Sequence, residues 1–199
     1  MADHYYSKDP HSKSDPRKWT FTLRGEKFFF NTDAGVFSKG EVDFGSRLLI
    51  ETFRMPASEG DILDVGCGYG PIGLAIAKSF PERTVHMVDV NGRAIELAGR
   101  NAKENAVENV RIYESDGLSN VEGQYGAILT NPPIRAGKDV VFKFYEEAYE
   151  KLMTGGELWV VIQKKQGAPS TIDRLTELFG GVETVEKKKG YYILKSEKH

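Results

Sequence analysis

The sequence is short of cysteine, of long apolar runs and of regularly spaced histidines, and each shortage excludes a class of protein. Cys67 is the only cysteine, so no disulfide can form within the chain, and a lone thiol fits a reducing cytosol. No apolar run is long enough for a membrane span or a secretion signal. The four histidines lack metal-ligand spacing, so we expect no metal site. The sequence therefore predicts a cytoplasmic protein with no membrane partner.

The chain also has little net charge. With 27 basic and 29 acidic residues it carries a formal charge of −2, so any contact with nucleic acid must come from local patches. Hydrophobic residues make up 40% of 199 positions, which suits one α/β domain. We expect residues 1–18 to form a flexible arm, with an ordered substrate-contacting arm as the alternative. Residues 19–199 would form a single domain, with a hairpin and helix over 19–56 and a core over 57–199.

The hydrophobic pattern predicts the order of the elements. The runs WTFTL and KFFFN, joined by Arg24–Glu26, predict a β-hairpin over 19–32, and a loop over 35–43 leads into a helix. From Asp61 onward, strand patterns alternate with helix patterns, and a closing antiparallel hairpin surrounds Lys189 and Gly190. The expected strands cover 61–66, 84–90, 109–115, 125–130 and 157–163, and the helices between and after them cover 71–80, 91–105, 141–152 and 172–179.

This alternation predicts a particular α/β architecture. We expect a Rossmann-like, doubly wound, mostly parallel seven-stranded sheet with a C-terminal antiparallel hairpin and an N-terminal β-hairpin extension. In such sheets ligands bind at the carboxyl ends of the strands, near the point where the strand order reverses.

A glycine-rich loop follows the first strand of the core, in the sequence DVGCGYGPIG. Its glycines permit a tight turn and close approach to a ligand, and Pro71 opens a helix whose amino end favours a polar ligand. Read from Gly68, the loop matches a dinucleotide fingerprint with Asp89 21 positions later, so a nicotinamide-dependent oxidoreductase is an alternative. Asp64, before the glycines, would repel a pyrophosphate and suits an amino-acid cofactor better.

Three acids follow three successive strands. Asp89 could accept both hydroxyls of a ribose, or it could serve only as the N-terminal charge of the next helix. Asp116 could accept a hydrogen bond from an adenine amino group, or it could belong to an ordinary Asp-Gly turn. Together with Asp64, these acids match the amino acid, ribose and base of S-adenosylmethionine in order.

The motif Asn131-Pro132-Pro133-Ile134 ends the fourth strand. It could be only a rigid strand exit. Alternatively, the Asn131 side-chain oxygen and the Pro132 carbonyl each accept one N–H bond from an exocyclic amino group. Such a nitrogen is a poor nucleophile because its lone pair is delocalised, and alignment alone can supply roughly 7–11 kcal/mol.

Taken together, these motifs resemble the class I S-adenosylmethionine-dependent methyltransferases that act on amino groups. With the upstream stretch GVFSKGEVDFGSRLLIE, the chain more narrowly resembles the small-subunit (16S) ribosomal RNA guanine-N2 methyltransferases. The resemblance runs from about Phe21 to Ser196. The resemblance implies that Asn131, Pro132, Pro133 and Ile134 are catalytic. It also implies these cofactor-binding residues: Phe37, Ser38, Asp64, Gly66, Cys67, Gly68, Asp89, Asn91, Asp116, Gly117 and Asn131.

The chain departs from this family in two ways. Well-known members carry two tandem domains, whereas the pattern here accounts for one. Members often place an aromatic residue after the two prolines, where stacking on a base contributes roughly 1–3 kcal/mol, but this chain has Ile134.

Four basic residues near the predicted site, Arg135, Lys138, Lys164 and Lys165, could contact phosphates around a flipped-out base, or could simply be solvated. We interpret Lys187, Lys188 and Lys189 as a solvated turn. The predicted function is methyl transfer from S-adenosylmethionine to guanine N2, with ribosomal RNA or the small ribosomal subunit as partner. The alternatives are a protein glutamine N-methyltransferase, a nicotinamide-dependent oxidoreductase and a catalytically silent binding module. The sequence does not determine the oligomeric state.

Overall fold

The computed structural model describes residues 13–37 and 40–199. The chain begins with an antiparallel pair of strands, β1 (Arg17–Leu23) and β2 (Glu26–Thr32). Arg24 and Gly25 join them in a two-residue turn with φ angles of 51° and 78°, the backbone form that tight hairpins require. The predicted hairpin is confirmed, and its first strand begins two residues earlier than expected.

A seven-stranded sheet forms the centre of the molecule. Its strands stand in the order β5-β4-β3-β6-β7-β9-β8. The first five in this order are parallel, and β9 runs antiparallel to both of its neighbours. The bounds are β3 Asp61–Val65, β4 Val85–Asp89, β5 Val110–Glu114, β6 Tyr125–Thr130, β7 Leu152–Gln163, β8 Glu183–Lys188 and β9 Tyr191–Glu197. The predicted mostly parallel sheet with a closing antiparallel hairpin is confirmed.

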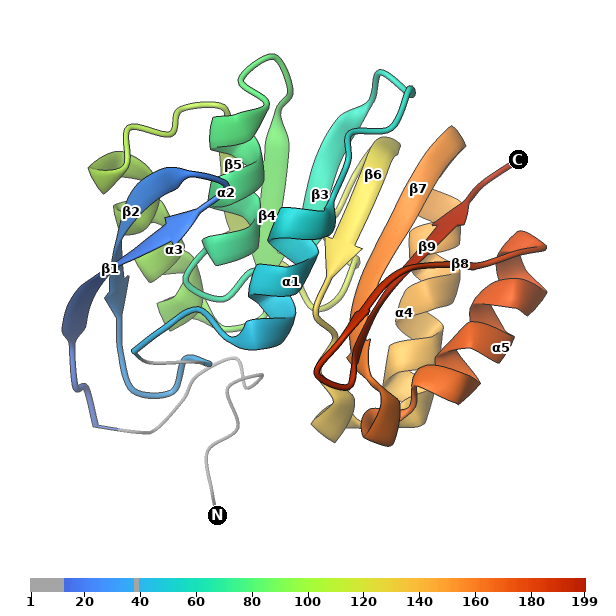
Figure 1. Cartoon of the computed structure of the whole chain (residues 1–199). Coiled ribbons are helices and arrows are strands. Elements are labelled where there is room, and N and C mark those ends of the chain that lie inside the picture. Colours follow the sequence, from blue (N-terminus) through green and yellow to red (C-terminus); the bar gives the residue numbers. More distant parts are fainter. Residues whose placement is uncertain (1–12, 38–39) are drawn as a thin grey trace.

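Helices cover both faces of this sheet (Figure 1). One hydrophobic cluster packs α1, α2 and α3 on one face, and a second packs α4 and α5 on the other. The helices and the two short 3₁₀ turns are α1 Phe44–Thr52, α2 Pro71–Ser79, α3 Gly92–Glu104, η1 Ile134–Ala136, α4 Lys138–Lys151, η2 Lys164–Gln166 and α5 Ala168–Phe179. The doubly wound arrangement leaves the carboxyl ends of the parallel strands open along one edge.

The predicted boundary between α4 and β7 was wrong. We expected the helix to include Leu152 and the strand to begin at Glu157, but β7 begins at Leu152, directly after the helix. The pairing with β6 shifts register between Tyr125 and Ala127. Gly155 has a φ of 78°, which accommodates this irregularity. Gly155 and Gly156 therefore lie inside the strand and interrupt its regular pairing, whereas we had expected them to precede it.

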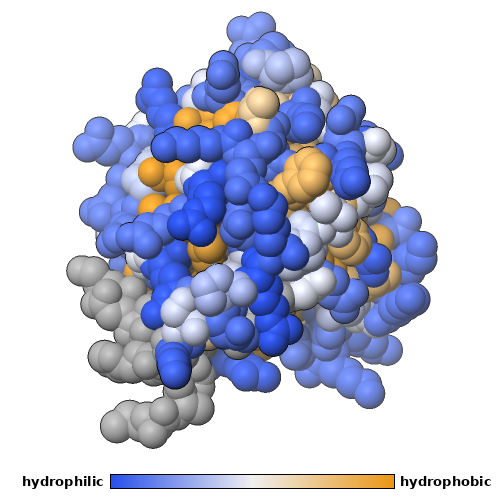
Figure 2. All heavy atoms as spheres, turned by 90° about the vertical axis from the view of Figure 1, so that its left-hand side faces the viewer, coloured by the Kyte–Doolittle hydropathy of each residue, from blue (hydrophilic) through white to orange (hydrophobic). Residues whose placement is uncertain are grey.

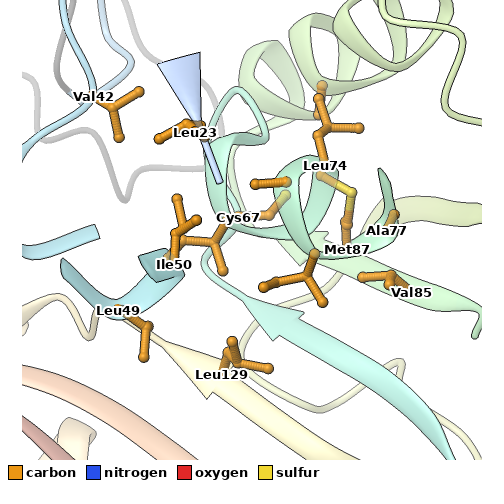
Figure 3. Packing of buried hydrophobic residues seen from close by; sticks show 14 of the residues in the cluster. Leu23, Val42, Leu49, Ile50, Cys67, Leu74, Ala77, Val85, Met87 and Leu129 are labelled. Atoms are coloured by element: carbon orange, nitrogen blue, oxygen red, sulfur yellow. The ribbon is translucent and has the colours of Figure 1, made fainter. Parts of the chain in front are cut away.

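The N-terminal segment shares its core with the sheet. Leu23 of β1 and Leu49 and Ile50 of α1 are fully buried. They belong to one hydrophobic cluster with Cys67 of the glycine loop and Leu74 of α2 (Figure 3). This packing holds the segment that leads into α1 beside the carboxyl ends of the strands.

The outer side of the hairpin and α3 is largely hydrophilic, with only small, separate hydrophobic areas (Figure 2). In the part of the chain that the structure describes, no helix combines the length and apolar character needed to cross a membrane.

Candidate active site

A cavity of about 490 Å³ opens at the carboxyl edge of the sheet. The strand order reverses between β3 and β6, and the loops after β3, β4, β5 and β6 line the cavity together with the segment before α1. Its walls include these predicted site residues: Phe37, Gly66, Cys67, Gly68, Asp89, Asp116, Gly117, Asn131, Pro132 and Pro133. Ser38, also predicted, lies outside the described residues.

The glycine loop leaves room for a ligand. Gly66 and Gly68 have φ angles of 73° and 56°, and a Cβ added at either would meet nothing within 4 Å. Gly70 has a different role, because a Cβ there would lie 2.9 Å from the Leu74 side chain. The first two glycines therefore keep the cavity wall bare, and the third lets the loop pack on α2.

Asp64 is buried behind this loop and does not line the cavity. Its Oδ2 accepts the Gly73 amide at 2.8 Å, but its Oδ1 has no hydrogen-bond donor among the described residues. Burial raises the pKa of Asp64 to about 7, against the Gly73 hydrogen bond and with the help of the nearby Asp89 carboxylate. A buried acceptor without a partner is costly, so the site fits a ligand that brings a proton donor or a positive charge.

Asp89 is held in place by backbone amides. Its two oxygens accept the Gly68 amide at 2.8 Å and the Asn91 amide at 2.9 Å. Burial raises the pKa of Asp89, and these hydrogen bonds oppose the rise. An ionised carboxylate has about four acceptor positions, so Asp89 keeps capacity for hydroxyl donors from a ligand.

Asn91 supports the site from behind. It is fully buried and does not line the cavity, although we predicted it as a cofactor ligand. Its side chain accepts the Ala94 amide at 3.2 Å, which caps α3, and donates to the Gly35 carbonyl at 2.9 Å. Asn91 thus ties α3 to the segment that carries Phe37.

Asp116 and Gly117 form the wall at the end of β5. Gly117 has a φ of 55°, and the Ser115 hydroxyl donates to its carbonyl at 2.9 Å, which stabilises the turn. The exposed Asp116 borders the cavity at this turn. The predicted Asp-Gly turn and the predicted ligand contact are therefore compatible.

The side-chain amide of Asn131 is oriented by α1. Its Nδ2 donates to Asp43 Oδ2 at 3.2 Å and to Ser46 Oγ at 3.1 Å. Because Asp43 Oδ2 accepts hydrogen bonds from both the Ser46 amide and Asn131, the NH₂ group of Asn131 faces Asp43. No described residue donates to Asn131 Oδ1, which remains an acceptor at the cavity wall.

Asp43 and Ser46 were missed by the sequence reasoning. Asp43 caps α1 by accepting the Ser46 amide at 3.0 Å, so the same carboxylate oxygen starts the helix and orients Asn131. An aspartate directly before an amphipathic run such as FGSRLLIETF is a helix-start signal, and it could have indicated the cap. It could not have indicated the partner, Asn131, which follows β6.

Pro132 and Ile134 form a tight turn after Asn131. The Pro132 carbonyl accepts the Ile134 amide at 2.9 Å, so one of its two lone pairs remains for another donor. Ile134 itself is half-buried, packs against the α4–α5 side of the core and does not line the cavity. The aromatic residues at the cavity are instead Phe37, which is 44% exposed, Tyr69 of the glycine loop and Phe144 of α4.

The four predicted RNA-contacting cations lie outside the cavity in two places. Arg135 and Lys138 sit at η1 and the start of α4, and Lys138 Nζ lies 5.0 Å from the Phe142 ring centroid. Lys164 and Lys165 form η2 and are exposed.

Comparison with known proteins places the chain in a family. Residues 27–195 match the family described as methyltransferase small domain, which is most of the chain. The chain belongs to this family.

Its relatives include both an uncharacterised protein and named enzymes. It is 59% identical over 200 residues to the uncharacterized protein YbxB of Bacillus subtilis, with both chains fully covered. It is 33% identical over 168 residues to ribosomal RNA small subunit methyltransferase C of Shewanella amazonensis, covering 82% of this chain and 48% of that one. The chain spans about half the length of the ribosomal RNA methyltransferases that it matches.

A similar solved structure is the T. thermophilus 16S rRNA N2 G1207 methyltransferase (RsmC) in complex with AdoMet and guanosine. It superposes with a TM-score of 0.83 at 26% identity, over 96% of this chain and 52% of that chain. The resemblance and the Rossmann-like methyltransferase fold predicted from the sequence are confirmed. The cofactor is S-adenosylmethionine, which decides against the nicotinamide alternative.

Proposed function

We propose that this chain transfers a methyl group from S-adenosylmethionine to an exocyclic amino nitrogen, namely guanine N2 of small-subunit ribosomal RNA. The observation that carries the proposal is the orientation of Asn131. Asp43 and Ser46 occupy its NH₂ group, which leaves Oδ1 as an acceptor beside the Pro132 carbonyl at the cavity wall. Two neutral acceptors on consecutive residues suit an NH₂ group with two hydrogens to donate.

The residues around the cavity fit the parts of the cofactor. Gly66 and Gly68 leave space for its methionine part. Asp64, buried behind this loop, has a partnerless Oδ1 that suits the positive charge of the ammonium group. Asp89 would accept from the ribose hydroxyls and Asp116 from the adenine amino group. When bound, the cofactor would supply an electrophilic methyl group on a sulfonium, and the neutral thioether that remains after transfer is a good leaving group.

The chain itself contributes alignment and electrostatics to the reaction. Asn131 Oδ1 and the free lone pair of Pro132 O hold the two N–H bonds of the target amine, which fixes the direction of its lone pair. As the new N–C bond forms, the nitrogen gains positive charge and both hydrogen bonds strengthen. No side chain at these positions is a strong base, so the surplus proton leaves the methylated nitrogen to solvent.

The choice of guanine N2 of ribosomal RNA is supported by the relatives that the chain resembles and by the aromatic lining of the site. The chain resembles ribosomal RNA small subunit methyltransferases and an RsmC structure that contains guanosine. Phe37 and Phe144 supply apolar aromatic surface at the cavity, which a base removed from its stack requires. The partner would be ribosomal RNA or the small ribosomal subunit.

The test is transfer of a labelled methyl group from S-adenosylmethionine to three substrates: purified 16S ribosomal RNA, assembled small subunits and glutamine-containing peptides. We expect label on guanine N2 of the RNA or the subunit, and far slower labelling with the Asn131→Ala variant. Label on peptide alone would support the glutamine alternative. Intact cofactor binding with no transfer to any substrate would support a catalytically silent module.

A further inference from the structure

The β8–β9 turn lies beside the end of β7, although the two are far apart in the sequence. The Lys164 amide donates to the Gly190 carbonyl at 2.9 Å, which ties η2 to this turn. Figure 1 shows the tip of the β8–β9 hairpin and η2 close together at the carboxyl edge of the sheet. Lys164, Lys165 and Lys189, all exposed, are thereby brought into one region.

The same turn reaches α1. The Tyr191 ring lies 5.4 Å from the Phe44 ring, and Lys189 Nζ lies 4.9 Å from the Phe44 ring centroid. The Arg47 guanidinium lies 5.3 Å from the same ring. Lys188 pairs directly with Tyr191, so it projects from the same face of the hairpin. We call this set of five cations the basic rim: Arg47, Lys164, Lys165, Lys188 and Lys189.

The positive charge of the basic rim is not compensated locally. Within residues 13–37 and 40–199, no ion pair involves any of its members, whereas Lys18, Lys143, Arg174 and Lys195 all have carboxylate partners. The acid next to this turn in sequence, Glu186, accepts the Lys187 amide at 2.9 Å. A chain with a net charge of −2 therefore keeps a strip of free positive charge at one place.

The basic rim borders the target-amine side of the cavity. Asp43 precedes Phe44 and accepts from Asn131, which connects the rim to the catalytic motif. Asp89 and Asp116 follow β4 and β5, on the other side of the strand-order reversal from β7 and β9. A macromolecule on the rim would therefore approach the amine pocket and leave the cofactor side free.

We propose that the basic rim binds the phosphate backbone of the RNA that carries the target base. This inference rests on the proposed RNA substrate. A base in the pocket stays linked to a phosphate on each side, and lysine and arginine at the pocket's border can bind those phosphates. Lys188 and Lys189 then belong to the substrate surface, rather than to a merely solvated turn.

The test compares two double variants that each remove two exposed lysines, one of them lying over a phenylalanine ring. Lys188→Gln/Lys189→Gln changes the rim, and Lys27→Gln/Lys103→Gln is the matched control at β2 and α3, where Lys27 Nζ lies 5.5 Å from the Phe29 ring centroid. Binding to purified 16S ribosomal RNA is measured by filter retention across a salt series. For the rim variant we expect about tenfold weaker binding near 0.1 M salt, and a slope of log affinity against log salt that is shallower by about 1.4–1.8.

The control variant should bind RNA like the unchanged chain, and both variants should bind S-adenosylmethionine normally by calorimetry. Equal losses in both variants, or no loss in the rim variant, would overturn the proposal. If the unchanged chain methylates RNA and the rim variant does so with the same KM, the rim proposal alone fails. If the unchanged chain labels only peptide and binds no RNA, the proposed RNA substrate fails, and the rim's role in binding RNA fails with it.

Discussion

The two edges of the central sheet differ in whether their polar groups have hydrogen-bond partners within the protein. At the amino edge, His86 Nε2 lies 3.0 Å from Asp61, its Nδ1 lies 3.3 Å from the Tyr113 and Tyr125 hydroxyls, and Tyr125 donates to the Glu122 carbonyl at 2.9 Å. Each group in this cluster finds a partner within the protein.

At the carboxyl edge, acceptors are left over. Asp64 Oδ1 has no donor among the described residues, and the Asn131 hydrogen bonds use only its NH₂ group. Because an unpaired buried acceptor costs stability, its persistence indicates that a ligand completes it. The comparison separates a polar cluster that holds the fold from one that serves the reaction, and the following changes test this separation.

The largest effect should come from Asn131→Ala. Removing the oriented acceptor should lower the single-turnover rate of methyl transfer about 100- to 1000-fold, as for other lost groups that align or stabilise the reacting atoms. Cofactor affinity, measured by calorimetry, should stay within about twofold, a small change on the free-energy scale. A variant that keeps its rate would remove Asn131 from the catalytic motif.

Asp64→Asn should act on the cofactor instead. A neutral amide lacks the negative charge that attracts an ammonium group, so S-adenosylmethionine affinity at pH 7.5 should fall roughly ten- to a hundredfold. Calorimetry measures this directly. Unchanged affinity would show that the partnerless oxygen serves the fold and not the ligand.

The same substitution should change how stability depends on pH. Burial raises the pKa of Asp64 to about 7 in the folded chain, whereas the unfolded value is about 3.9. Between these values the unfolded chain loses a proton that the folded chain retains, so this group's contribution to stability falls as pH rises from about 4 to about 7. In urea titrations without cofactor, the free energy of unfolding of the Asp64→Asn variant should therefore fall less between these pH values than that of the unchanged chain. Parallel curves for both proteins would contradict the assignment.

A smaller kinetic effect is expected from Asp43→Ser. Serine caps a helix about as well as aspartate, so α1 should lose less than about 0.5 kcal/mol, but its shorter side chain cannot hold the Asn131 amide. We expect about a tenfold lower kcat with little change in KM, in line with losses from misplaced catalytic groups.

Asp43→Asn is the matched control, because one amide oxygen can still accept from both Ser46 and Asn131. It should restore most of the rate. Equal rates for the serine variant and the unchanged chain would show that the orientation of Asn131 does not depend on Asp43.

The smallest effect on the reaction is expected at the amino edge. Tyr125→Phe removes a hydroxyl that bonds the Glu122 carbonyl and His86, which should lower the free energy of unfolding by about 1–2 kcal/mol. Methyl transfer below the unfolding temperature should be unchanged. A slower reaction at temperatures where the variant is fully folded would mean that the two edges are coupled, and the distinction between them would fail.

Much of the fold was predictable because its signals are local. The pattern of YGAILT gave β6 to the residue, and Asn91 marked the start of α3 as its cap. The start of β7 was missed because two adjacent glycines, here Gly155 and Gly156, normally indicate a turn, and only pairing with β6 makes them part of a strand.

The sequence by itself determined the glycine loop, the acids after successive strands and the Asn131-Pro132-Pro133 motif, because the carboxyl ends of parallel strands must meet at one edge. Only the tertiary structure decided which side chains act on one another there. The bond from Asn131 to Asp43 spans 88 positions, and Lys164 meets Gly190 only because β9 pairs with β7. Such contacts depend on how α1 and the last hairpin pack, and no local pattern in the chain encodes that packing.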